Sequence, residues 1–115
     1  MAEIHGSQQI FSSSSTGAGD WYQLNPKLGN TTFQVLTTGS SAGALVSSVC
    51  AFQASNDGVN PLATVLGTVT LSSAASPASD GLAINANWKY VRVNMTSIST
   101  STGAKTTVLA NGQVR

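Results

Sequence analysis

The stretch at residues 88–98, WKYVRVNMTSI, decides the fold class. Its apolar and polar side chains alternate, so that Val91 and Val93 would point to one side of a strand and Tyr90 and Arg92 to the other. A period of two over this length is typical of a β-strand with one buried face. We therefore expect a strand at 88–98 whose valines lie in the core.

The same alternation recurs on both sides of this stretch, and no stretch has a helical period. Further strands are expected at 21–24, 31–38, 44–54, 61–71, 81–85 and 105–110. Turn-forming residues separate them, among them Ser55-Asn56-Asp57-Gly58, and a loop is expected at 72–81. Seven to nine short strands of this kind predict an all-β, antiparallel two-sheet β-sandwich, with an up-and-down barrel as the alternative.

The segment before residue 20 is polar and carries one short apolar pair, Ile10-Phe11, before a serine run. One interpretation is a first strand followed by a flexible Ser-rich loop. The other is an extended N-terminal arm that docks on a neighbour through Ile10 and Phe11. We accordingly divide the chain into an arm or first strand at 1–19 and a β-sandwich domain at 20–115.

Composition excludes several classes of protein. Only 8% of the 115 residues are charged, and the net charge is +1 with no basic cluster, so nucleic acid is not expected as a partner. No apolar run approaches the about 18 residues of a membrane span, and no secretory signal is recognised. The single cysteine fits synthesis in a reducing cytoplasm.

Residues that could carry chemistry are few and scattered. One histidine (His5) and one cysteine (Cys50) are too few for a zinc site, and Cys50 lies on the inward side of an alternating strand. Three of the four acids, Asp20, Asp57 and Asp80, stand beside turn residues, where short carboxylates bond to the backbone. We expect no enzymatic activity, no metal and no cofactor.

Two pairs of aromatic residues, Trp21-Tyr22 and Trp88 with Tyr90, each stand near the start of a strand. One interpretation is that the indoles cover the ends of the core. The other is an exposed surface that binds a partner or stacks on a sugar, because Trp and Tyr bury large areas at a small entropic cost. Tyr90 and Arg92 lie opposite the valines of their strand and are candidates for a contact between subunits.

Two stretches carry a resemblance to a known group of proteins. Residues 51–60, AFQASNDGVN, and residues 88–97, WKYVRVNMTS, resemble a strand–turn element and the closing hairpin of small β-sandwich proteins in the virions of tailed phages. Among these the chain is most similar to capsid decoration, or cement, proteins. The resemblance implies a jelly-roll sandwich that forms small oligomers on the capsid exterior and binds the major capsid protein.

These observations lead to one functional prediction and one alternative. The prediction is a virion structural protein, made in the host cytoplasm, that cements a capsid by binding the major capsid protein and itself as a dimer or trimer. The alternative is a carbohydrate-binding or spacer module of a phage tail or host-attachment structure. The interface candidates are Ile10, Phe11, Tyr90 and Arg92, and the candidates for sugar stacking in the alternative are Trp21 and Trp88.

Overall fold

A computed structural model describes residues 3–4, 6–24, 28–84, 88–99 and 103–114. This part of the chain forms ten β-strands, and no helix that could cross a membrane is found in it. The strands are β1 (Glu3–Ile4), β2 (Gly6–Ser13), β3 (Gly17–Ala18), β4 (Tyr22–Leu24), β5 (Leu28–Thr38), β6 (Leu45–Ser55), β7 (Gly67–Ala75), β8 (Ala78–Ile84), β9 (Tyr90–Ile98) and β10 (Lys105–Val114).

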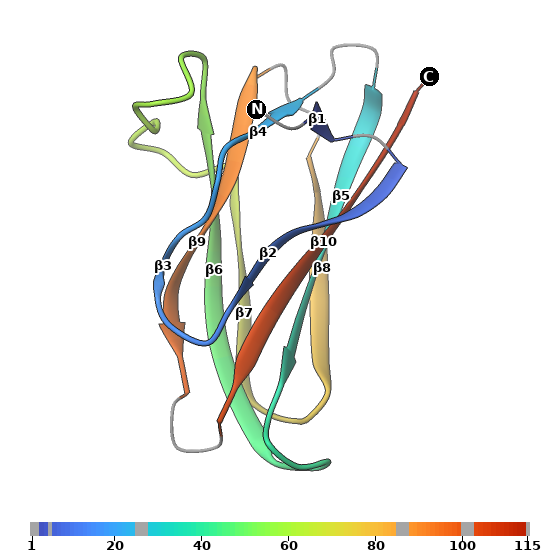
Figure 1. The fold of residues 1–115 in the computed structure, drawn as a ribbon, viewed down its shortest axis with the longest axis vertical. Helices are drawn as coiled ribbons and strands as arrows, with labels where there is room; N and C mark the ends of the chain where they lie inside the picture. Colours follow the sequence, from blue (N-terminus) through green and yellow to red (C-terminus); the bar gives the residue numbers. More distant parts are fainter. Residues whose placement is uncertain (1–2, 5, 25–27, 85–87, 100–102, 115) are drawn as a thin grey trace.

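The strands form two sheets that pack face to face (Figure 1). Sheet A has the order β1-β4-β9-β6-β7, and β3 also pairs with β9. Sheet B has the order β2-β10-β5-β8. All pairs are antiparallel except β1 with β4. The predicted all-β, two-sheet sandwich is thus confirmed.

The connectivity is that of a jelly roll. The eight longer strands pair as β2 with β10, β4 with β9, β5 with β8 and β6 with β7, which is one long hairpin rolled up on itself. Successive pairs of this hairpin alternate between sheet B and sheet A. Rolling produces two sheets of nested strands, the arrangement that defines a double-sheet jelly roll.

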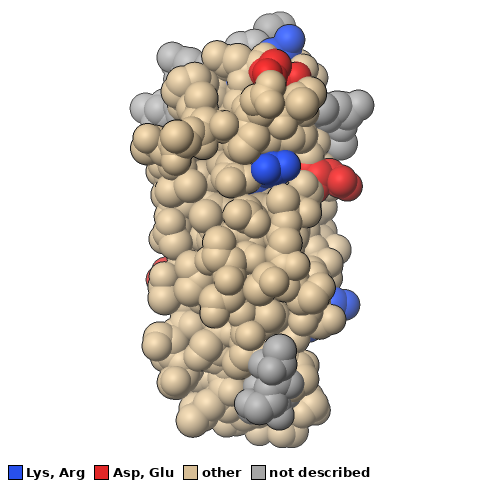
Figure 2. Space-filling model, turned by 90° about the vertical axis from the view of Figure 1, so that its left-hand side faces the viewer, with Lys and Arg blue, Asp and Glu red and all other residues tan. Residues whose placement is uncertain are grey.

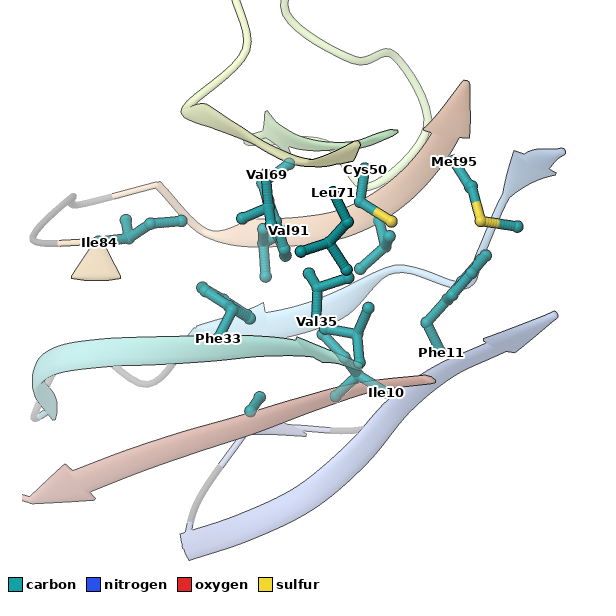
Figure 3. Packing of buried hydrophobic residues seen from close by; sticks show 14 of the residues in the cluster. Ile10, Phe11, Phe33, Val35, Cys50, Val69, Leu71, Ile84, Val91 and Met95 are labelled. Carbon is teal, nitrogen blue, oxygen red and sulfur yellow. The ribbon is translucent and has the colours of Figure 1, made fainter. Parts of the chain in front are cut away.

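The core lies between the sheets and is built from the alternating positions of the strands (Figure 3). Val91 and Val93 of β9 are buried, as their alternation predicts. Phe33 of sheet B meets Phe52 of sheet A with 4.8 Å between the ring centroids. Aromatic rings at this separation add to the stability that the buried apolar area provides.

The structure corrects the expectation of an extended N-terminal arm. Residues 6–13 form β2, an edge strand of sheet B, and Ile10 and Phe11 lie in the core with exposed fractions of 5% and 9%. Phe11 pairs with Val108 while Gln9 pairs with Leu109, so Ile10 is the extra residue of a β-bulge. The bulge turns two consecutive side chains inward, which strict alternation forbids. The arm interpretation is therefore wrong for Ile10 and Phe11, and the sandwich begins before residue 20.

The structure also corrects the expected strand and loop boundaries between β6 and β8. The expected loop at 72–81 is largely strand, since β7 ends at Ala75, β8 begins at Ala78, and only Ser76 and Pro77 lie between. Conversely, residues 61–66 are not strand. Small residues suffice in β7 and β8 because both are edge strands, which have less apolar area to bury.

Candidate interaction surfaces

The described residues contain no group of three or more His, Cys, Asp or Glu side chains that could hold a metal ion. His5 lies outside the described residues. Cys50 is fully buried, and this burial raises the pKa of its thiol to about 11. Since the thiolate is the reactive form, Cys50 is a packing residue and not a nucleophile.

A hydrogen-bonded turn follows β6 and fixes the start of the loop at 56–66. The Asp57 carboxylate accepts bonds from the backbone N–H groups of Asn60 and Val59, both at 2.8 Å, and from the Ser55 hydroxyl at 2.7 Å. Led by the Asn60 backbone bond, these bonds hold the pKa of Asp57 well below its usual range. The turn presents Val59, which is 71% exposed, in a fixed position at one end of the sandwich.

A row of three side chains crosses the outer face of sheet A and is called the Arg92 row. Arg92 of β9 stacks on the Trp21 ring, with its guanidinium carbon 4.6 Å from the ring centroid. Its Nε donates a hydrogen bond of 2.7 Å to Oε1 of Gln53, the residue paired with it on β6. Just before β9 begins, the Lys89 ammonium lies 5.5 Å from the centre of the Tyr90 ring. Two cations thus rest on aromatic rings at this end of the sheet.

The structure brings together only part of the predicted set. Trp21, Tyr90 and Arg92 share the outer face of sheet A and are all half-buried. Trp88 is also half-buried but packs against the core. Sequence reasoning missed Gln53 as the partner of Arg92. Its outward position was visible from the alternation of 44–54, whereas the register that sets it opposite Arg92 was not.

The outer face of sheet B is a second candidate. The exposed Lys105 stands at one end of this face, and the three rows beyond it are here called the uncharged face. Its central row places Leu109 between Gln9 and Gln34, and Leu109 is 39% exposed. A shallow hollow of about 400 Å³ lies over this part of the face. The three rows across β2, β10, β5 and β8 are Ser12, Thr107, Leu36 and Ser79; Gln9, Leu109, Gln34 and Gly81; and Ser7, Asn111, Thr32 and Ala83. None of these side chains ionises, and none is buried.

The sheet edges are poorly suited to pairing with another strand. β1 has two residues, and β2 is interrupted by its bulge. On β8, Asp80 stands at an inward-facing position, paired with the buried Val35, yet it is exposed, and its carboxylate accepts a 2.8 Å hydrogen bond from the Gly81 N–H. β7 lies against β8. Short edges, bulges and inward charges all discourage edge-to-edge association, so the two outer faces and the end that presents Val59 are better suited to a partner than the edges are.

Comparisons with known proteins support the fold and go no further. No family model matches the chain, and no curated protein sequence matches it. The solved structure of the SPBc2 prophage-derived protein YomS is similar to it, with a TM-score of 0.59 over 90% of this chain and 88% of that chain. The sequence identity between them is 12%. The chain is therefore similar in fold, over nearly its whole described length, to a protein derived from a prophage.

Proposed function

We propose that this chain is a structural protein of a phage virion that decorates the capsid exterior and cements it by binding the major capsid protein and further copies of itself. The observation that carries the proposal is the uncharged face, which presents three rows of exposed or half-buried side chains without an ionisable group. Burying such a face against a neighbour removes no ion from water, and that is the main cost of burying a charged surface.

The size of the uncharged face indicates how it would act. Four strands about 4.8 Å apart and three rows about 7 Å apart give a flat area of about 400 Å². A specific interface buries about 800 Å² on each partner. One face therefore supplies about half of a stable contact, and a second contact, through the outer face of sheet A, would complete it. When both form on one lattice, the second benefits from a high effective concentration.

Two further observations support a virion role. The similarity to YomS covers nearly all of both chains, and YomS is derived from a prophage. Only 8% of the residues are charged, which suits a subunit whose surface is packed against neighbours. In this proposal the chain acts by binding its neighbours and catalyses no reaction.

The alternative function is a carbohydrate-binding or spacer module of a phage tail or host-attachment structure. Sugar stacking requires an open aromatic face. The Arg92 guanidinium covers one face of Trp21, and Trp88 packs against the core. Neither indole is therefore a fully open platform, and we favour the capsid over the sugar-binding role.

Cryo-electron microscopy of the phage particle that carries this protein tests the proposal. We expect regular density of this jelly roll on the outer capsid surface, bridging neighbouring subunits through the uncharged face. Particles that carry the protein should withstand a higher temperature than matched particles that lack it. Density confined to the tail would favour the alternative, and particles lacking the protein altogether would refute both.

A further inference from the structure

The Arg92 guanidinium is contacted by two side chains but has unused hydrogen-bond donors. It lies over the Trp21 ring, and its Nε is hydrogen-bonded to Gln53, so both contacts restrict its movement. Arginine has five N–H donors, of which this bond uses one. In the described part of the chain no carboxylate pairs with the two terminal nitrogens, and Asp20, next to Trp21 in sequence, makes no ion pair with them.

A second cation lies near the Arg92 row. The Lys89 ammonium lies over the ring of Tyr90, and Tyr90 stands two residues before Arg92 on the same face of β9. Asp57, which follows the paired strand β6, already accepts its hydrogen bonds within its own turn. Figure 2 shows the side of the molecule on which β9 and β6 lie, where acidic residues stand near the basic ones, yet none of the described carboxylates pairs with the Arg92 guanidinium.

We propose that the Arg92 row binds an acidic side chain, Asp or Glu, of the protein on which this chain docks. The proposal rests on the proposed function for the identity of that partner, although not for the chemistry. A carboxylate matches the terminal nitrogens of a guanidinium with two parallel hydrogen bonds. Because Trp21 and Gln53 already restrict the movement of the guanidinium, its immobilisation costs less when the partner binds. Lys89 adds a second attraction for an acidic segment.

The chemistry can be tested without the partner, using hexaglutamate as the probe. The Arg92 Nε–H signal in ¹⁵N NMR spectra reports on the row directly, since this group is hydrogen-bonded to Gln53. We expect hexaglutamate to shift this signal, and the uncharged hexaglutamine to leave it nearly unchanged. Binding followed on neighbouring backbone signals should weaken at least about tenfold in Arg92→Lys, which keeps the charge but loses the paired donors.

Matched variants separate this site from general attraction. Gln53→Glu places a carboxylate against Arg92 from within the chain, so it should fill the site and abolish the response while the protein stays folded. Thr70→Glu adds the same charge to the outer side of β7, and Lys105→Gln removes one positive charge from sheet B; both should bind hexaglutamate nearly as the wild type does. An equal response to hexaglutamine, or equal losses in Lys105→Gln and Arg92→Lys, would overturn the proposal.

Binding to particles distinguishes failure of this inference from failure of the proposed function. Wild-type protein that binds hexaglutamate but never binds the phage capsid would leave the carboxylate site standing and refute cementing. Gln53→Glu protein that loses hexaglutamate but coats the capsid as the wild type does would refute the docking role of the Arg92 row and leave cementing intact. We expect Gln53→Glu to lose both.

Discussion

A buried chain of three hydroxyl groups connects the two sheets, and breaking it at the middle should destabilise the fold. The Thr37 hydroxyl of β5 lies 2.8 Å from that of Thr106 on β10 and 2.9 Å from that of Ser48 on β6. All three side chains have exposed fractions of 1% or less. Since β5 and β10 belong to sheet B and β6 to sheet A, Thr37 is the link between the sheets.

The magnitude follows from the partners that Thr37→Val leaves behind. The substitution nearly preserves shape but removes the central hydroxyl, so Ser48 and Thr106 each lose a bond at a fully buried position. A buried polar group left unsatisfied costs about 1–3 kcal/mol, so two such groups cost about 2–6 kcal/mol in total, against a typical stability of about 5–15 kcal/mol for a domain. With a urea m-value of about 2 kcal/mol/M, the unfolding midpoint falls by about 1–3 M.

The control removes the whole hydroxyl chain. In the triple variant Thr37→Val, Ser48→Ala, Thr106→Val no buried hydroxyl is left unpaired, so its urea midpoint should lie closer to that of the wild type than the single variant's does. A single variant as stable as the wild type would show that the hydroxyl chain contributes nothing. A triple variant less stable than the single one would show that packing, and not hydrogen bonding, explains the loss.

Two further predictions concern groups with shifted pKa values. Cys50 is buried with its pKa raised to about 11, so a thiol reagent near neutral pH should fail to label the folded protein and should label it fully in denaturant; labelling of the folded form would contradict the assigned burial. The pKa of Asp57 is lowered in the folded state, so its stabilising effect is complete above the unfolded-state value of about 4 and declines as the pH falls through the folded-state value. The difference in melting temperature between wild type and Asp57→Asn should therefore narrow below about pH 4, and a difference independent of pH would show that the carboxylate charge is not involved.

Alternation in the sequence was sufficient to predict the central strands. The strands β9 and β5, which carry Val91, Val93 and Phe33, have a neighbouring strand on each side. One face of each strand is buried and the other is exposed to solvent, and this arrangement produces a period of two. The class of fold follows from such strands, because they can bury their apolar sides only against a second sheet.

The edge strands could not be predicted in the same way. The Ile10-Phe11 pair breaks the alternation because a bulge turns both side chains inward, and a bulge depends on the partner strand as well as on the local sequence. The Arg92 row also depends on the pairing between strands. Arg92 and Gln53 could be assigned to an outer face, but the register that brings Trp21, Arg92 and Gln53 together belongs to strands distant in the sequence.

The treatment of the edges and the scarcity of charge have a common consequence for assembly. Many sheet proteins keep copies apart with surface charge, and this chain has little of it. Uncontrolled association through strand edges is instead limited by the bulge at Ile10 and the exposed Asp80. Contacts are thereby left to side chains on the two faces, where shape and a few polar groups decide the partner. On a surface with few charges, the Arg92 cation favours a partner that presents a carboxylate opposite it. We therefore expect Arg92 to contribute more to the choice of partner than to the strength of binding.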